Sequence, residues 1–168
     1  MKFSKRFSSS SCPCRLENLA FAIAISLLAG ALSSAFSFQR IHSFSELSVP
    51  PLTPPGWVFP VVWAVLYALM GWSAYLIAAA KVSTSEKGCA LFLYGLQLLV
   101  NFMWSIVFFR LEKLGGSVAV ILVLLGLLIG MLLLFRKIRP LAAWLNLPYL
   151  CWTAFASYLN IGIWMLNR

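Results

Sequence analysis

Aromatic and amide side chains recur at helical spacing in three stretches of this sequence. Residues three or four positions apart share one face of a helix, so each stretch predicts a stripe along one side of a helix. The three stripes are Phe59, Trp63, Tyr67 and Gly71; Tyr94, Gln97, Asn101, Trp104, Ser105 and Phe108; and Tyr149, Trp152, Ala156 and Asn160. Indole and phenol rings offer flat apolar surface, and their N–H and O–H groups can hold the polar end of a ligand. The chemistry these residues support is the binding of a flat, apolar molecule.

The amides of Gln97 and Asn101 lie in an otherwise apolar stretch. An amide exposed to hydrocarbon carries a large transfer cost, so we expect both side chains to face inward. Opposite a wall of tryptophans they favour a cavity, and Ala156 leaves room there for a ligand or for close helix approach. The alternative is that such groups only join helices through hydrogen bonds. For Asn160, near the end of its stretch, we prefer that alternative.

Residues for other kinds of chemistry are missing from the apolar stretches. None of them holds a central Asp, Glu, His, Lys or Arg, the usual marks of a proton or ion relay. No phosphate loop, nucleophile–base pair or metal-ligand cluster occurs. We interpret His42, the single histidine, as a solvated loop residue, and the four cysteines as thiols, including Cys12 and Cys14 around Pro13. The sequence therefore disfavours ion-coupled transport and hydrolysis, and it requires no metal or cofactor.

The composition predicts an all-α membrane protein. Of the 168 residues, 62% are hydrophobic and 10% are charged, whereas a soluble domain carries about 25% charged residues. Five apolar segments are each long enough to cross a bilayer, which takes about 20 residues. They run over Leu19–Phe38, Gly56–Ala80, Cys89–Phe109, Leu114–Phe135 and Leu141–Leu166. We expect a basic, Ser-rich tail over residues 1–17 and one bundle of five transmembrane helices over residues 18–168.

The net charge of +9 does not indicate a nucleic-acid partner, because the positive residues are scattered through short loops. Their distribution instead predicts the orientation in the lipid bilayer. One side would hold Lys2, Lys5, Arg6, Arg15, Lys81, Lys87, Arg136, Lys137 and Arg139; the other would hold Arg40, Arg110, Lys113 and Arg168. We expect the N-terminus in the cytoplasm and the long first loop, Gln39 to Pro55, outside.

The start of the chain allows other interpretations. A basic stretch followed by an apolar run can be a signal peptide, but this run continues to Phe38, so we expect a retained first span. A bacterial cell membrane is the expected location. The Ser-rich, acid-poor start keeps an organelle membrane as the alternative.

Small residues form ridges on the first and fourth segments. Ser26, Gly30 and Ser34 recur every four residues, and Gly126 and Gly130 form a GxxxG pattern. Such ridges let helix backbones approach closely. The sequence leaves open whether they pack within one chain or form a homodimer.

Three ordered motifs resemble those of the TspO/MBR family, the tryptophan-rich sensory proteins related to the translocator protein (peripheral benzodiazepine receptor). The motifs are Pro54-Pro55-Gly56-Trp57-Val58-Phe59 with Val62-Trp63 and Leu66-Tyr67; Gln97 to Asn101 with Trp104-Ser105 and Phe108-Phe109; and Leu147-Pro148-Tyr149 with Trp152, Phe155-Ala156 and Leu159-Asn160. The resemblance runs from about Asn18 to Asn167, which is nearly the whole chain.

This resemblance implies a five-helix bundle whose pocket is closed by the first loop. It implies Trp63 and Trp152 as pocket tryptophans, Gln97 and Asn101 as a polar wall, and Ala156 as the small residue beside the ligand. The stripes add Phe59, Tyr67 and Tyr149 to the expected ligand-binding residues. Ligands of the family are porphyrins such as protoporphyrin IX and isoquinoline carboxamides, with cholesterol in animal members.

The resemblance leaves two activities open. The preferred one is a porphyrin-binding sensor or translocator-like receptor, and the alternative is an enzyme that degrades porphyrins oxidatively or with light through Trp63 and Trp152. Cholesterol is not expected as a ligand, because Ile161 and Met165 stand where its proposed motif has Tyr and Arg. The first loop also departs from the family at Ser43-Phe44 and Leu52-Thr53, which predicts a weaker lid.

Overall fold

A computed structural model of the chain describes residues 13–37 and 47–168. All regular structure in these two ranges is helical. The helices are α1 (Pro13–Ser37), α3 (Val58–Ala78), α4 (Thr84–Ser105), the π-helical turn η2 (Ile106–Arg110), α5 (Leu114–Ile138) and α6 (Pro140–Leu166). The predictions for Cys12, His42 and Ser43-Phe44 lie outside the described residues.

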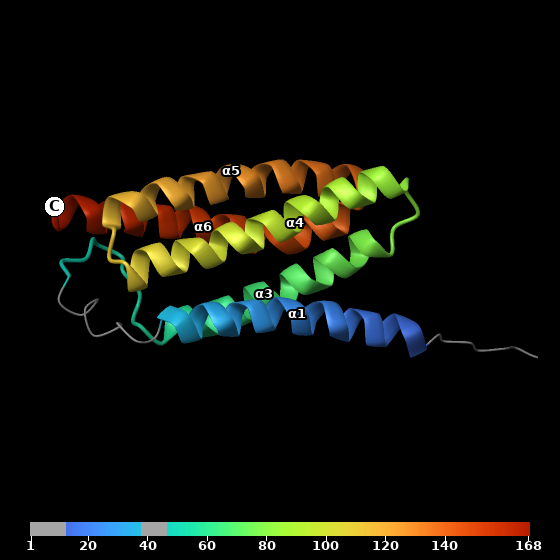
Figure 1. Cartoon of the computed structure of the whole chain (residues 1–168), viewed down its shortest axis with the longest axis horizontal. Helices are drawn as coiled ribbons and strands as arrows, with labels where there is room; N and C mark the ends of the chain where they lie inside the picture. Colours follow the sequence, from blue (N-terminus) through green and yellow to red (C-terminus); the bar gives the residue numbers. More distant parts are fainter. Residues whose placement is uncertain (1–12, 38–46) are drawn as a thin grey trace, which may run out of the picture.

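The five long helices run lengthwise beside one another (Figure 1). Helix α1 packs mainly against α3, α3 against α6, α6 against α5, and α5 against α4. Short connections of a few residues join α3 to α4 and α5 to α6. The three predicted stripes therefore lie on α3, α4 and α6, and their inner faces meet inside one bundle.

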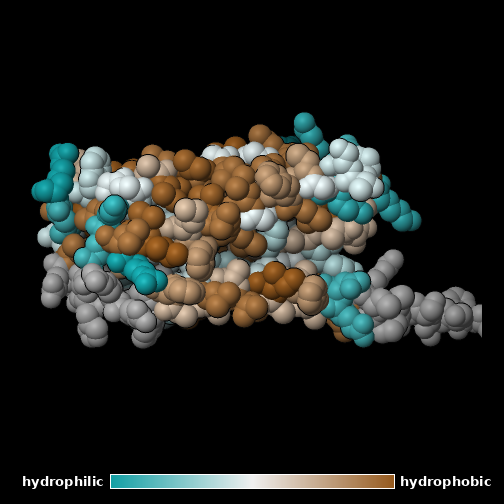
Figure 2. Space-filling model, in the orientation of Figure 1, coloured by the Kyte–Doolittle hydropathy of each residue, from teal (hydrophilic) through white to brown (hydrophobic). Residues whose placement is uncertain are grey.

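Four of the helices are long and apolar enough to cross a membrane. They are α1 over Leu16–Phe36, α3, α4 continued by η2 over Thr84–Arg110, and α5. Figure 2 shows the corresponding surface, with hydrophobic side chains over the middle and hydrophilic ones towards both ends. The sequence prediction of five spans is thus matched by five helices, of which four have the composition of a span.

The fifth helix, α6, carries polar side chains along its length. Four of them, Asn146, Thr153, Ser157 and Asn160, are nearly fully buried within the bundle. They lower the average hydropathy of α6 without lying on its outer face. These polar side chains of α6 therefore face the interior of the protein.

Local signals explain where the helices begin. Helix α4 begins at Thr84, five residues before the predicted apolar segment, because Ser83 and Glu86 form a capping box. The Glu86 backbone N–H donates to Ser83 Oγ, and the Ser83 N–H donates to the Glu86 carboxylate. Pro140 occupies the first turn of α6. A backbone N–H there would have no intrahelical acceptor, so the missing N–H of proline costs no hydrogen bond.

The end of the α4 segment widens into the π-helical turn η2. The Leu111 N–H donates to the Ile106 carbonyl oxygen five residues earlier, at 2.9 Å. Trp104 and Phe108, four residues apart, are neighbours on an α-helix as well, and the wider turn also brings Phe109 to Trp104. Trp104 stacks on Phe108 with ring centroids 5.7 Å apart, and Phe109 meets both rings edge-on.

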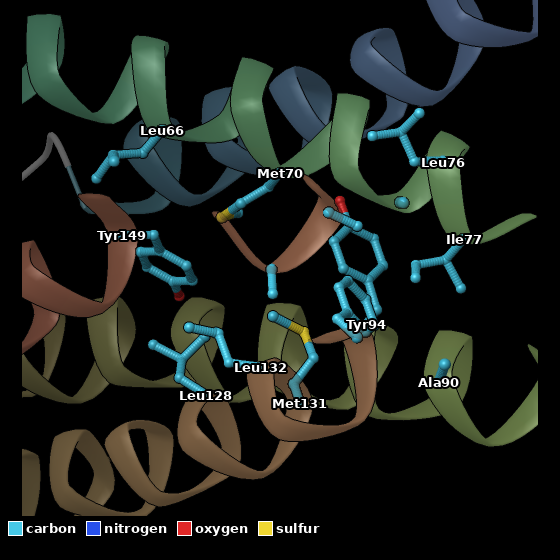
Figure 3. Close-up of a cluster of buried hydrophobic side chains, with 14 of the residues drawn as sticks. Leu66, Met70, Leu76, Ile77, Ala90, Tyr94, Leu128, Met131, Leu132 and Tyr149 are labelled. Atoms are coloured by element: carbon cyan, nitrogen blue, oxygen red, sulfur yellow. The ribbon is translucent and has the colours of Figure 1, made fainter. Parts of the chain in front are cut away.

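The interior holds two clusters of buried hydrophobic side chains. The first core cluster is the larger and joins α3, α4, α5 and α6; Figure 3 shows Met70, Tyr94, Leu128, Met131 and Tyr149 among its members. The second core cluster lies towards the first loop and consists of Trp104, Phe108, Ile121, Ala156 and Ile163. The second core cluster has fewer members than the first, and Trp63 and a few other half-buried residues pack at its edge.

The small-residue ridges have different surroundings. A Cβ at Gly71 would lie 2.5 Å from the Ile23 Cα, so Gly71 permits close approach of α3 and α1. Gly30 of α1 lies against the Tyr67 ring. Around Gly126 and Gly130 no heavy atom of the described residues lies within 4 Å of such a Cβ. The α1 ridge therefore packs within the chain, whereas the α5 ridge is open.

Candidate ligand-binding site

Three aromatic rings surround Trp63 where α3, α4 and α6 meet, and together they form a group of four rings. The Trp63 ring centroid lies 5.6 Å from Tyr67, 6.5 Å from Trp104 and 6.0 Å from Tyr149. These separations are typical of aromatic pairs that attract each other. Trp63 is half-buried and packs against both core clusters, so the group spans the boundary between them.

Two hydrogen bonds tie the predicted polar wall to these rings. The Asn101 side-chain N–H donates to the Tyr67 hydroxyl at 2.8 Å, and the Tyr149 hydroxyl donates to Gln97 Oε1 at 3.0 Å. Both amides are almost fully buried. Burial without partners would be costly, so the tyrosine hydroxyls stabilise the amides in the interior. Trp63, Tyr67, Gln97, Asn101 and Tyr149 thus form one connected group.

The α4 stripe has the predicted orientation throughout. Its six residues, Tyr94, Gln97, Asn101, Trp104, Ser105 and Phe108, are all buried. Tyr94 forms a 2.6 Å hydrogen bond with Ser26 of α1, so the stripe contacts α1 at one end. At the other end Trp104 and Phe108 belong to the second core cluster.

Trp152 and Phe59 form a second ring group. Their centroids lie 5.8 Å apart at 70°, and Trp152 also contacts Phe155 at 5.7 Å. This group borders a cavity of about 420 Å³ between α3 and α6. Its apolar lining is Val61, Val62, Val65, Leu66, Pro148, Cys151, Trp152 and Phe155. Because Val61 and Val65 are exposed, we call this space the outer cavity.

The structure thus distributes the predicted pocket residues over two groups. Trp63 contacts Tyr67, Trp104 and Tyr149, while the ring partners of Trp152 are Phe59 and Phe155. The predicted pairing of Trp63 with Trp152 across one ligand stays a prediction. Ala156 joins the second core cluster, one turn along α6 from Trp152.

The described part of the first loop, residues 47–55, is anchored on the C-terminal half of α6, next to the second core cluster. Asn167 accepts from the Ser48 N–H at 3.0 Å and donates to the Ser48 carbonyl oxygen at 2.8 Å. The Tyr158 hydroxyl donates to the Pro51 carbonyl oxygen at 3.0 Å. Pro50 packs on Gly162, where a Cβ would lie 2.8 Å from the proline ring. Leu47, which precedes Ser48, packs against the second core cluster itself.

One buried group was not predicted to bind a ligand. Trp104 lies on the α4 stripe, and its indole N–H is buried with no hydrogen-bond partner among the described residues. Helical spacing places the ring on the inner face but does not reveal that its N–H lacks an acceptor. The amide nitrogens of Gln97 and Asn160 are buried in the same state.

The described residues offer no metal site. Within residues 13–37 and 47–168, no group of three or more His, Cys, Asp or Glu side chains could hold a metal ion. Cys89 and Cys151 are free thiols on exposed positions. The groups that could contact a ligand at the site are therefore aromatic rings, neutral hydrogen-bond donors and neutral acceptors.

Comparison with known proteins gives a consistent set of relatives. The model of the TspO/MBR family matches residues 22–165, which include all eight predicted ligand-binding residues. The Tryptophan-rich protein TspO of Chlorobaculum tepidum is 34% identical over 155 residues, covering 91% of this chain and 98% of that protein. Protein CrtK of Rhodobacter capsulatus is 32% identical over 139 residues, covering 83% and 86%. The Translocator protein of Ovis aries is 34% identical over 126 residues, covering 74% and 75%.

Proposed function

Since the chain belongs to the TspO/MBR family, we propose that it is a receptor of the sensor or translocator type that binds a flat tetrapyrrole, such as protoporphyrin IX, among α3, α4 and α6. Family membership and the four apolar helices make it a multi-pass membrane protein. The ligand and the residues that hold it are the proposed part. No cofactor is assigned to the site.

The observation that carries this proposal is the ring group around Trp63 with its two hydrogen-bonded amides. A porphyrin presents a broad π face, which stacks on indole and phenol rings. The half-buried Trp63 is the ring at the edge of both core clusters, so a ligand that entered between them would meet it first. The amides of Gln97 and Asn101 fix Tyr149 and Tyr67 on either side.

We extend the proposal to all five helices as spans. Helix α6 has 27 residues, and a helix rises about 1.5 Å per residue, so it is long enough for a hydrocarbon core of about 30 Å. Its buried asparagines face the bundle, while Leu141, Trp144 and Met165 are exposed on it. Polar residues on an inner face are compatible with a span.

We further propose a bacterial cell membrane, with the N-terminus in the cytoplasm and the first loop outside. The positive charges of the loops favour this orientation. A cysteine at Leu52, which is 80% exposed, should react with a membrane-impermeant maleimide in intact cells. Reaction only after permeabilisation would reverse the orientation.

A titration of the purified protein with protoporphyrin IX in the dark tests the proposed function. We expect saturable binding, seen as tryptophan quenching and as a change in porphyrin absorbance. Trp63→Leu should weaken binding by about 0.5–1.5 kcal/mol beyond the loss of buried area, because a stacking ring is removed. Trp144→Leu is the matched control, since Trp144 is exposed on α6. Non-saturable quenching, or equal losses in both variants, would refute the proposal.

A further inference from the structure

Several buried polar atoms lack a hydrogen-bond partner among the described residues, and the donors of Trp104 and Asn160 are two of them. Trp104 is 8% exposed and Asn160 is 1% exposed, yet Trp104 Nε1 and Asn160 Nδ2 have no partner among the described residues. A buried polar group without a partner loses its hydration and gains nothing in return. Such groups are rare in folded proteins, and each one calls for a physical reason.

Both donors belong to the same part of the bundle. Trp104 is a member of the second core cluster together with Ala156 and Ile163. Asn160 lies four residues after Ala156 and three before Ile163, on the same face of α6. The second core cluster therefore brings an indole from α4 and an amide from α6 to one end of the bundle.

The oxygen atom of the Asn160 side-chain amide is held by a hydrogen bond. The Ser117 hydroxyl of α5 shares its proton between the Leu114 carbonyl oxygen, at 2.7 Å, and Asn160 Oδ1, at 2.8 Å. Ser117 precedes Ile121 of the cluster by one turn. With its oxygen fixed on α5, Asn160 presents its amide nitrogen as the free end.

We propose that Trp104 Nε1 and Asn160 Nδ2 form a subsite that binds an oxygen acceptor, a carbonyl or carboxylate group, of the ligand. The inference rests on the proposed function. It adds that one polar substituent of the porphyrin-like ligand fixes the direction in which the ligand lies in the site. The apolar ring stacks near Trp63, whose centroid lies 6.5 Å from Trp104, and the oxygen points into the second core cluster. A flat hydrocarbon without such an oxygen leaves both donors unsatisfied.

The described part of the first loop, residues 47–55, begins at this same end of the bundle. Leu47 packs against the second core cluster, and Ser48 is bonded to Asn167 just beyond it. Trp104 and Asn160 are themselves almost fully buried, and a neutral donor gains strength where water is excluded. The described members of the cluster carry no charge, so recognition depends on hydrogen bonds rather than on ion pairing.

Three porphyrins and two variants test the subsite. Protoporphyrin IX has carboxylates, its dimethyl ester has carbonyl oxygens only, and etioporphyrin has neither. Trp104→Phe keeps a ring and removes the donor, so we expect about 2- to 13-fold weaker binding of the dimethyl ester, a larger loss for protoporphyrin IX with its charged carboxylates, and unchanged binding of etioporphyrin. Asn160→Leu should have the same pattern. Retained etioporphyrin binding shows that each variant is folded.

A measurement on the unmodified chain provides an independent readout. The indole N–H resonance of Trp104 in ¹⁵N-tryptophan-labelled protein should move downfield with protoporphyrin IX but not with etioporphyrin. Equal effects of Trp104→Phe on all three porphyrins, or no change of the Trp104 resonance, would overturn the subsite while porphyrin binding stands. If the wild-type protein binds none of the three, the proposed function itself fails.

Discussion

The side chain of Asn101 donates a 2.8 Å hydrogen bond to the Tyr67 hydroxyl, and this bond joins α4 to α3 beside the Trp63 ring. Tyr67 is 7% exposed and Asn101 is 2% exposed, so no water replaces either partner easily. The bond therefore holds one wall of the candidate site in place. Its removal has a predictable cost.

We predict that Tyr67→Phe lowers the free energy of unfolding by about 1–3 kcal/mol, because the Asn101 amide is left buried without its acceptor. Tyr75→Phe is the matched control, since Tyr75 is a half-buried tyrosine on the same helix. Denaturant unfolding in detergent micelles measures both. The double variant Tyr67→Phe with Asn101→Leu should lose less stability than the two single changes add up to. Strict additivity would show that the bond is energetically unimportant.

The α1–α3 contact predicts a sharp difference between two glycines. Gly71→Ala places its methyl 2.5 Å from the Ile23 Cα and 2.7 Å from the Ala22 carbonyl oxygen, so the helices must separate. We expect a loss of about 1–3 kcal/mol in unfolding free energy. Gly126→Ala adds the same methyl where no described heavy atom lies within 4 Å, and it should be neutral or slightly stabilising. A Gly71→Ala variant as stable as Gly126→Ala would show that this close contact is absent.

Much of this architecture could be predicted from sequence because it depends on apolar length and helical period. The five helices agree with the five apolar segments to within about five residues at each end, apart from the longer start of α1. That earlier start, at Pro13, places the end of the predicted tail inside the helix. The burial of Gln97 and Asn101 could also be predicted, because an amide within an apolar helix has to avoid hydrocarbon.

Spacing could not predict which helix each stripe contacts. Residues four apart rotate by about 40° per step around a helix, so Gly71 is turned by about 120° from Phe59. Phe59 consequently contacts Trp152, Trp63 contacts Trp104, and Gly71 contacts α1. The contact between Trp104 and Phe109 could not be predicted from α-helical spacing either, because it requires the π-helical turn.

The anchoring of the first loop predicts its opening behaviour. Asn167→Ala removes two hydrogen bonds to Ser48, so amide exchange at Ser48 should accelerate by about tenfold or more. Tyr158→Phe removes a single bond to Pro51 and should have a smaller effect. Hydrogen–deuterium exchange in nanodiscs measures both variants. Unchanged exchange in Asn167→Ala would show that packing of Pro50 on Gly162 holds the loop instead.

Receptor function and porphyrin breakdown make different predictions under light. A receptor returns its ligand unchanged, so protoporphyrin IX extracted after illumination should have its original absorbance spectrum, apart from the bleaching seen without protein. The measurement compares the absorbance of porphyrin extracted from the wild-type protein with that of porphyrin extracted from the double variant Trp63→Phe with Trp152→Phe. New absorbing products that form only with the wild-type tryptophans would favour the enzymatic alternative.

The central claim is that the ligand binds inside the bundle at the Trp63 ring group rather than in the outer cavity beside Trp152. Photolabelling with a diazirine derivative of protoporphyrin IX, followed by mass spectrometry, tests it most directly. We predict that excess protoporphyrin IX suppresses labelling of Trp63, Trp104 and Ala156, from α3, α4 and α6. Suppressible labelling confined to Val61, Val65 and Cys151 of the outer cavity would contradict the claim.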